Sequence, residues 1–197
     1  MKNLLWQNLL LIILSCLIVI SMFFSKQIGP AFEYHRQAVL DGQLYRLLTA
    51  HLVHTNIYHS LLNLGGLILV WGIAFQYVSS RDWLIALCLS AVLVSAGLVL
   101  FNPEVQWYRG LSGILHGLLV VAVLKARQLP GLIRGIILFL FVVKVLMEQT
   151  QSGFWQSEQL IGAPVIVDAH LYGLVAGFLS YLLLGRVKSK KMFRSRF

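Results

Sequence analysis

The stretch LLWQNLLLIILSCLIVISMFF, at residues 4–24, contains 21 residues and no charged side chain. An α-helix rises 1.5 Å per residue, so a helix of this length matches the hydrocarbon core of a bilayer. The stretch is longer than the apolar core of a secretory signal, and no small-x-small cleavage site follows it. We therefore expect it to remain in the mature protein as a membrane helix.

Five more apolar stretches of comparable length follow, and together they predict an all-α, polytopic membrane protein with six spans. The fifth stretch contains Arg134 and Lys144, whose long side chains we expect to extend to the membrane interface. Neither a repeat nor a second domain is apparent, so we predict a single six-helix membrane domain over residues 1–197. The predicted spans are residues 4–24, 57–78, 83–101, 110–127, 132–147 and 164–184.

The composition of the whole chain agrees with a membrane protein. Of the 197 residues, 58% are hydrophobic and only 12% are charged, whereas a soluble domain carries roughly a quarter charged residues. So few polar residues cannot cover a water-facing surface, which excludes a soluble globular protein, a disordered chain and a secreted disulfide scaffold. Cys16 and Cys88 both lie inside apolar stretches, and we predict neither a disulfide nor a metal site from them.

The distribution of charge predicts the topology. Sixteen Lys and Arg residues against seven Asp and Glu give a net charge of +9. A basic tail at residues 185–197 follows the last span. A basic segment next to a membrane helix usually lies on the cytoplasmic side of the membrane, and we prefer this interpretation of the charge to nucleic-acid binding. With six spans both termini share that side, and six of the seven acids fall on the opposite side. We predict a multi-pass protein of a bacterial inner membrane, with cytoplasmic termini, no nucleic-acid partner and the lipid bilayer as its surroundings.

Polar side chains inside the spans are costly in a bilayer, so they are candidates for function. His59 and Asn63 are four residues apart and share one face of the second span. Ser112 lies near the start of the fourth span, and His170 near the start of the sixth. These three spans all run inward from the outer side. The side chains of His59, Ser112 and His170 should therefore reach a similar depth, roughly 5–10 Å below the outer surface.

The fourth and sixth spans also carry matching G-x-x-x-G steps, at residues 113–117 and 173–177. This spacing lets two helix backbones approach closely. A close crossing of the two spans would set Ser112 against His170. The sequence therefore predicts a serine–histidine pair within the membrane.

A neighbouring imidazole can take the proton of a serine hydroxyl and so make the serine a nucleophile. Asp168 lies two residues from His170, on another face of the helix, so we predict a dyad with Ser112 and no third member. The tetrahedral oxyanion needs hydrogen-bond donors. The Ser112 backbone N–H lacks an intrahelical partner at the helix start, and the side chains of His59 and Asn63 are further donors.

Other interpretations of these residues remain open at this point. A serine in a membrane helix commonly donates to a carbonyl of its own helix, and a lone histidine is commonly structural. His51, His54 and His59 could form a metal cluster, but no set of carboxylates or thiolates accompanies them, and we predict no metal or cofactor. Lys144 could form a serine–lysine dyad, although its place near a span end favours extension to the interface. The common depth of the polar side chains favours catalysis.

Four short motifs between Tyr45 and Gly177 resemble, in order and placement, those of the rhomboid intramembrane serine proteases. They correspond to a pair in the first loop, a second-span signature, a nucleophile motif and a sixth-span motif. In that order they read Tyr45-Arg46; His54 with His59-x-x-x-Asn63; Gly110-x-Ser112-Gly113; and His170-x-x-Gly173-x-x-x-Gly177.

The resemblance implies a serine endopeptidase with Ser112 as the nucleophile and His170 as the general base. It also implies an oxyanion hole formed by His59, Asn63 and the Ser112 backbone N–H. The residues that it implies as supporting are Gly110, Gly113, His116, Gly173, Gly177, Arg46 and His54.

His116 departs from the family pattern, because many rhomboids have a tyrosine four residues after the serine, stacked on the catalytic histidine. The segment GLSGILHG at residues 110–117, in a compact chain, resembles the rhombosortase branch. That resemblance implies single-span membrane substrates with a glycine-rich C-terminal sorting tail, cleaved on the periplasmic side. We expect His116 to position or stack on His170 rather than to act as the base. The alternatives are a rhomboid of broader specificity and a non-catalytic membrane binding or transport protein.

Overall fold

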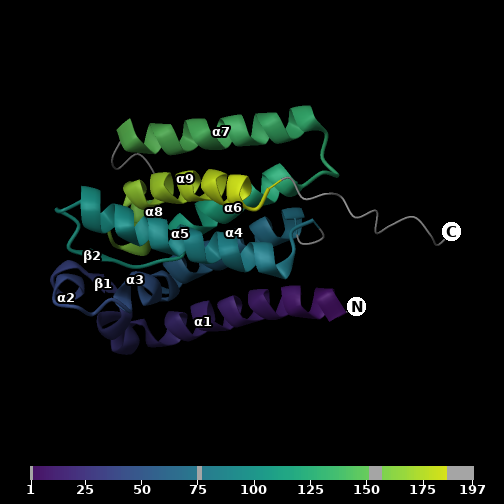
Figure 1. The fold of residues 1–197 in the computed structure, drawn as a ribbon. Coiled ribbons are helices and arrows are strands. Elements are labelled where there is room, and N and C mark those ends of the chain that lie inside the picture. The colour runs from purple at the N-terminus through teal and green to yellow at the C-terminus, as the bar shows by residue number, and fades with distance from the viewer. Residues whose placement is uncertain (1, 75–76, 151–156, 186–197) are drawn as a thin grey trace.

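The computed structural model describes residues 2–74, 77–150 and 157–185, so the predicted basic tail lies outside the described residues from residue 186 onward. The described chain is dominated by helices, with one pair of very short strands (Figure 1). In chain order the elements are α1 (Lys2–Phe32), β1 (Tyr34–His35), α2 (Arg36–Leu40), α3 (Arg46–Thr49), η1 (Ala50–Leu52), α4 (Ile57–Ala74), α5 (Ser80–Phe101), β2 (Trp107–Tyr108), α6 (Ser112–Lys125), α7 (Gly131–Thr150), α8 (Ser157–Ile161) and α9 (Val167–Leu183).

Each predicted apolar stretch overlaps one helix of the structure, and in chain order these helices are α1, α4, α5, α6, α7 and α9. The helices α1, α5 and α7 extend beyond their predicted stretches, whereas α4, α6 and α9 lie within theirs. Within the described part of the chain, three helices are long and apolar enough to cross a membrane: Leu9–Phe32, Ile57–Ala74 and Ser80–Phe101. The apolar helices α6 and α9 are shorter, and α7 is interrupted by charged side chains. The predicted all-helical, polytopic membrane architecture is confirmed, whereas the number of six spans stays a prediction.

The first helix is longer than the predicted span and is broken inside. The backbone at Phe24 leaves the helical region (φ −116°, ψ 18°), at the predicted end of the span, and a second helical segment continues to Phe32. Pro30 lies in this second segment and lacks a backbone N–H for the helical ladder. The chain therefore changes direction where the apolar stretch ends.

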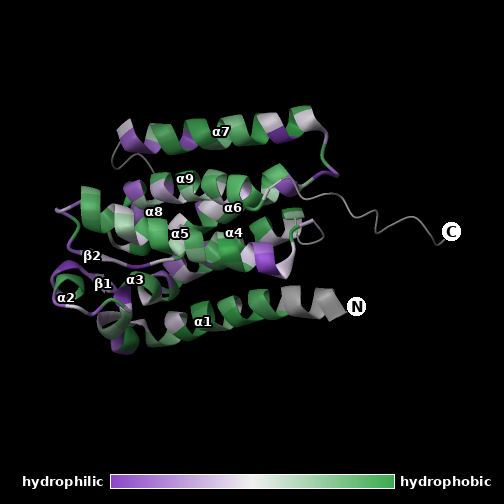
Figure 2. Cartoon of the chain, in the orientation of Figure 1, coloured by the Kyte–Doolittle hydropathy of each residue, from purple (hydrophilic) through white to green (hydrophobic). Residues whose placement is uncertain are grey.

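The central helices α4, α5, α6 and α9 lie between α1 on one flank and α7 on the other (Figure 1). Apolar residues run along these helices, and the segments around α2, α3, β1 and β2 are more hydrophilic (Figure 2). Many large apolar side chains are exposed, among them Leu69, Leu132, Phe139 and Leu182. In a bilayer this apolar surface faces lipid, and the helices satisfy their own backbone hydrogen bonds.

The two central helices α6 and α9 pack backbone to backbone. A Cβ atom on Gly117 would lie 2.8 Å from the Gly173 carbonyl oxygen, and one on Gly177 would lie 2.5 Å from the Gly117 carbonyl oxygen. A Cβ atom on Gly173 would collide with the Gly113 carbonyl oxygen. Only glycine permits this approach. The crossing holds the first turn of α6 against the first turn of α9.

Arg46 is buried and ties the first loop to the end of α1. Its Nη1 donates to the carbonyl oxygens of Pro30 at 3.0 Å and Glu33 at 2.8 Å, and its Nε donates to Gln43 Oε1 at 2.7 Å. Nearby, β1 pairs antiparallel with β2. Arg109 Nε also forms an ion pair with Glu33 at 2.6 Å. These contacts anchor the segment that leads into α6.

Candidate active site

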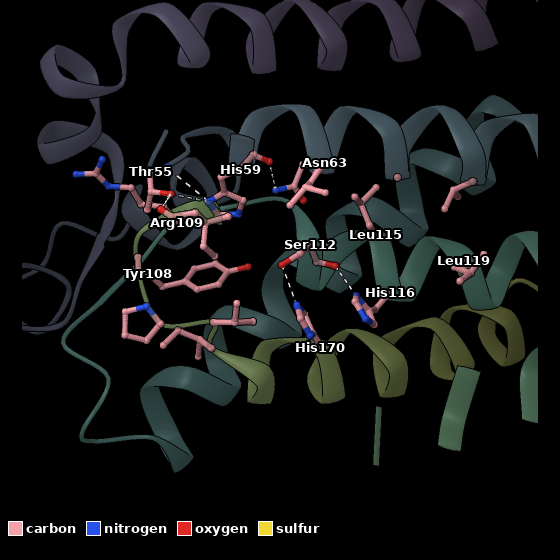
Figure 3. Close-up of a pocket in the computed structure, with 18 of the residues that line it drawn as sticks. Thr55, His59, Asn63, Tyr108, Arg109, Ser112, Leu115, His116, Leu119 and His170 are labelled. Atoms are coloured by element: carbon pink, nitrogen blue, oxygen red, sulfur yellow. Dashed lines mark hydrogen bonds between the residues drawn. The ribbon is translucent and has the colours of Figure 1, made fainter. Parts of the chain in front are cut away.

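A cavity of about 300 Å³ lies between α4, α6, α9 and the segments at one end of the bundle. The side chains predicted to carry the chemistry line this cavity from three different helices (Figure 3). Its remaining walls are largely apolar, with Leu115 and Leu119 following along α6. The residues of this polar group are His59, Asn63, Ser112, His116 and His170.

Gly110 shapes the entry into α6. Its φ of +122° is unfavourable for other residues, and a Cβ atom there would lie 2.6 Å from His59 Nε2. Its N–H donates to the Ala50 carbonyl oxygen at 3.0 Å, and the Tyr108 hydroxyl donates to its carbonyl oxygen at 2.8 Å. The chain is thereby held in a sharp bend, so that Ser112 begins the helix at the wall of the cavity.

Ser112 and His170 are in hydrogen-bond contact, with 3.0 Å between Oγ and Nε2. The other ring nitrogen, Nδ1, lies 3.1 Å from Glu148 Oε2. An ionised carboxylate can only accept, so Nδ1 carries the proton and Nε2 accepts from the serine hydroxyl. This is the tautomer that a general base needs in order to take a serine proton.

His116 lies beside this pair, and its two ring nitrogens are both engaged. Its Nδ1 donates to the Ser112 carbonyl oxygen at 2.8 Å, because a carbonyl only accepts. Its Nε2 therefore accepts from Lys144 Nζ, also at 2.8 Å. The ring is stacked on His170, with centroids 4.1 Å apart. Neither nitrogen faces the serine hydroxyl, so this geometry is that of a positioning group.

His59 and Asn63 flank Ser112 on the α4 side of the cavity (Figure 3). The Thr55 backbone N–H points at His59 Nδ1 at 3.5 Å, so Nδ1 accepts and Nε2 carries the proton. The Nε2–H group of His59 lies close to Gly110, because a Cβ atom on Gly110 would be only 2.6 Å from Nε2. The Asn63 amide donates to the His59 carbonyl oxygen at 3.0 Å. Two side-chain donors thus stand close to the start of α6.

The other two histidines of this region are buried structural groups outside the spans. His54 packs edge-on against His59, and its backbone N–H donates to Ser21 Oγ at 2.8 Å. His51 Nε2 lies 3.0 Å from Ser95 Oγ. Burial lowers the pKa of His51 to about 4 and, together with the charge of His59, lowers the pKa of His54 to about 3. In the described part of the chain, the side chains grouped closely enough to hold a metal ion do not include His51, His54 or His59.

One partner of His170 is not predicted by the sequence. The carboxylate in contact with its ring is that of Glu148, from α7, and not that of the neighbouring Asp168. The prediction that Lys144 extends to the membrane interface is also wrong, because Lys144 Nζ lies 2.8 Å from Glu148 Oε1 and contacts His116. The i,i+4 spacing of Lys144 and Glu148 at the end of an apolar stretch is compatible with an ion pair, and this was a usable signal.

The donor atoms of His116, Glu148 and His170 lie within 4.8 Å of one another, a grouping able to bind a metal ion. The Lys144 ammonium contacts two of these three side chains. The ammonium group therefore provides, beside Glu148 and His116, the positive charge that a bound metal ion would otherwise provide. The arrangement fits a hydrogen-bonded network better than a cation site.

The comparisons with known proteins give one family match. The model of the Rhomboid domain matches residues 41–187, which is most of the chain. No curated protein matches the chain. Rhomboid proteins are serine intramembrane proteases that act on membrane-protein substrates within the bilayer. The chain belongs to the rhomboid family and is a membrane-embedded protein of that protease class.

Proposed function

We propose that this protein is an intramembrane serine endopeptidase in which Ser112 is the nucleophile and His170 is the general base. The observation that carries the proposal is the 3.0 Å contact between Ser112 Oγ and His170 Nε2. The proton on His170 Nδ1 supports it, because Nε2 is then free to accept.

In the first step His170 Nε2 takes the Ser112 hydroxyl proton as Oγ attacks the scissile carbonyl carbon. The negative charge on the carbonyl oxygen is stabilised by the Ser112 backbone N–H and by the side chains of His59 and Asn63. The imidazolium then protonates the departing amine, which leaves an acyl-enzyme. A water molecule, deprotonated by the same imidazole, hydrolyses this ester and regenerates the serine.

The substrates proposed are single-span membrane proteins cut near the outer end of a C-terminal transmembrane helix, with glycine-rich sorting tails as in the rhombosortase branch. The segment GLSGILHG at residues 110–117, with His116 at the fourth position after the serine, supports this branch. The protein is proposed to lie in a bacterial inner membrane, with six spans, cytoplasmic termini and a cavity open to the periplasm. The Gly110 bend and the loop elements at the cavity end support an opening on the side of the first loop.

The test is covalent labelling of the full-length protein in membranes with a serine-directed fluorophosphonate. Wild type should be labelled, and Ser112→Ala should not be labelled. Ser180→Ala, which removes a buried serine further along α9, is the matched control and should label like wild type. Equal labelling of Ser112→Ala and wild type would reject Ser112 as the nucleophile.

The proposed specificity is tested separately with a pair of single-span reporters. One carries a glycine-rich junction before its transmembrane helix and the other carries leucines at the same positions. Preferential cleavage of the first supports the rhombosortase-like specificity. Equal cleavage of both would assign the chain to rhomboids of broader specificity.

A further inference from the structure

Glu148 is a buried carboxylate on a helix that is otherwise largely exposed. Its relative exposure is 5%, and Val145 is the other buried residue among the described residues of α7. A buried charge is costly unless it is paired and hydrogen-bonded. The position of Glu148 therefore needs specific partners in the bundle.

Both carboxylate oxygens of Glu148 have such partners. Oε2 accepts from His170 Nδ1 at 3.1 Å, and Oε1 forms an ion pair with Lys144 Nζ at 2.8 Å. Since His170 Nε2 meets Ser112 Oγ, the three side chains form a continuous series from hydroxyl through imidazole to carboxylate. The series is assembled from three helices, α6, α9 and α7.

Lys144 closes this series into a ring of contacts. Its Nζ donates to His116 Nε2, and His116 Nδ1 donates back to the carbonyl oxygen of Ser112. His116 is also stacked face to face on His170. Each polar atom of the ring therefore has a partner that fixes its orientation. An ordered network of this kind holds its members in one geometry.

We propose that Glu148 is a positioning residue of this site, which holds His170 in the tautomer that accepts the Ser112 proton. It also stabilises the imidazolium that forms during the reaction. Lys144 holds the carboxylate in place and supplies its counter-charge. The inference rests on the proposed function, and it assigns the orienting role to Glu148 of α7 rather than to Asp168, the acid next to His170 in the sequence.

Asp168 provides the contrast within the same chain. It is the acid nearest to His170 in the sequence and lies in the same first turn of α9. It is half-buried, and among the hydrogen bonds of the described residues the ring of His170 is bonded to Glu148 and Ser112. Neutralising Asp168 changes charge near the site without touching the network, so it is the matched control.

The experiment uses the full-length protein in proteoliposomes with a single-span reporter substrate. We expect Glu148→Gln to lower kcat by roughly 10²- to 10⁴-fold with little change in KM, because the amide can impose the wrong tautomer on His170. Glu148→Asp keeps a carboxylate, so its kcat should be at least tenfold higher than that of Glu148→Gln. Asp168→Asn should stay within about twofold of wild type. A Glu148→Gln enzyme within threefold of wild type would overturn the proposal.

A spectroscopic measurement keeps the inference testable if Glu148→Gln is inactive for other reasons. The proton on His170 Nδ1, bonded to a carboxylate, should give a low-field proton resonance in the wild-type protein. The resonance should persist in Ser112→Ala and Asp168→Asn and disappear in Glu148→Gln and His170→Ala. Its persistence in Glu148→Gln would overturn the role of Glu148. Cleavage by Ser112→Ala would instead reject the proposed function and leave this result standing.

Discussion

The imidazole ring of His116 is stacked on that of His170, with centroids 4.1 Å apart and an angle of 8° between the planes. The second face of His116 packs on Phe141, with centroids 5.1 Å apart. His116 is therefore held between the base and an aromatic ring of α7. An aromatic group at this place supports the orientation of His170 by its flat surface, whatever its own protonation.

We therefore expect His116→Tyr to retain measurable proteolysis, because tyrosine can provide the same stacking surface. His116→Ala should lose more activity, since it removes both the stack and the hydrogen bond to the Ser112 carbonyl oxygen. The measurement is the initial rate of reporter cleavage for both variants at equal protein in the membrane. If His116→Tyr were as inactive as His170→Ala, His116 would have to take part in proton transfer itself.

Ser112→Ala and His170→Ala should each abolish cleavage while leaving membrane insertion unchanged. The two side chains act as a unit, so the double variant should be no slower than either single variant. The comparison of the three rates with that of Ser180→Ala checks this expectation. Rate losses that multiply in the double variant would mean that the two residues work independently.

Gly173→Ala should destabilise the protein, because the added Cβ meets the Gly113 carbonyl oxygen across the α6–α9 crossing. Overpacking of this kind costs about 1–3 kcal/mol in well-packed cores, and a backbone atom cannot move aside as a side chain can. The measurement is the thermal unfolding midpoint in detergent. Gly65→Ala in α4, where a Cβ meets no atom within 4 Å, is the matched control and should not lower the midpoint. Equal midpoints for both variants would argue against a close crossing.

The sequence predicted the helices and the polar group at the cavity because both signals are local in the chain. The hydropathy of a span is set by consecutive residues. The pairing of His59 with Asn63 on one helix face, and each G-x-x-x-G step, involves residues only one helical turn apart. The hydropathy of a stretch does not indicate how far α1 continues beyond its apolar residues. The extension to Phe32 depends on contacts such as those of Arg46, which come from the folded loop.

Glu148 could not be assigned to His170 by the same reasoning. The two residues are 22 positions apart on different helices, and their contact depends on how α7 is rotated about its axis. An i,i+4 pair of Lys144 and Glu148 near a span end is equally compatible with a surface ion pair at the membrane interface. Only the packing of α7 against α9 distinguishes the two settings.

The stability of the protein should fall as the pH is lowered from 6.5 towards 4. The folded-state pKa values of His51 and His54 are depressed to about 4 and about 3, from an unfolded value of 6.5. Between 6.5 and these folded-state values the unfolded chain binds more protons than the folded protein, so the free energy of unfolding is greatest above pH 6.5 and falls until the pH reaches the folded-state values. For His51 the loss is on the order of 3 kcal/mol.

The thermal midpoint of wild type, measured in detergent across this pH range, checks this expectation. His51→Gln should flatten the profile, because it removes one of the buried groups that must be protonated. His35→Asn, which changes an exposed histidine, is the control and should keep the wild-type profile. A profile of His51→Gln that parallels wild type would show that the burial of His51 does not set the pH dependence.

The six-span topology depends on α7 crossing the membrane. Gln128 lies in the connection before α7, and Gln159 lies in α8 after it; both are exposed, and they fall at opposite ends of the bundle (Figure 1). Cysteines introduced there, in a chain whose exposed Cys16 and Cys88 are replaced by alanine, should differ in reaction with a membrane-impermeant thiol reagent. Gln159→Cys should react in intact cells, as should the control Asp41→Cys in the first loop, and Gln128→Cys should react only after the membrane is opened.

If Gln128→Cys and Gln159→Cys reacted alike, α7 would not cross the membrane, and α6 and α9 would enter it from opposite sides. Ser112 and His170 would then lie at opposite faces of the bilayer, and the proposed catalytic pair could not form.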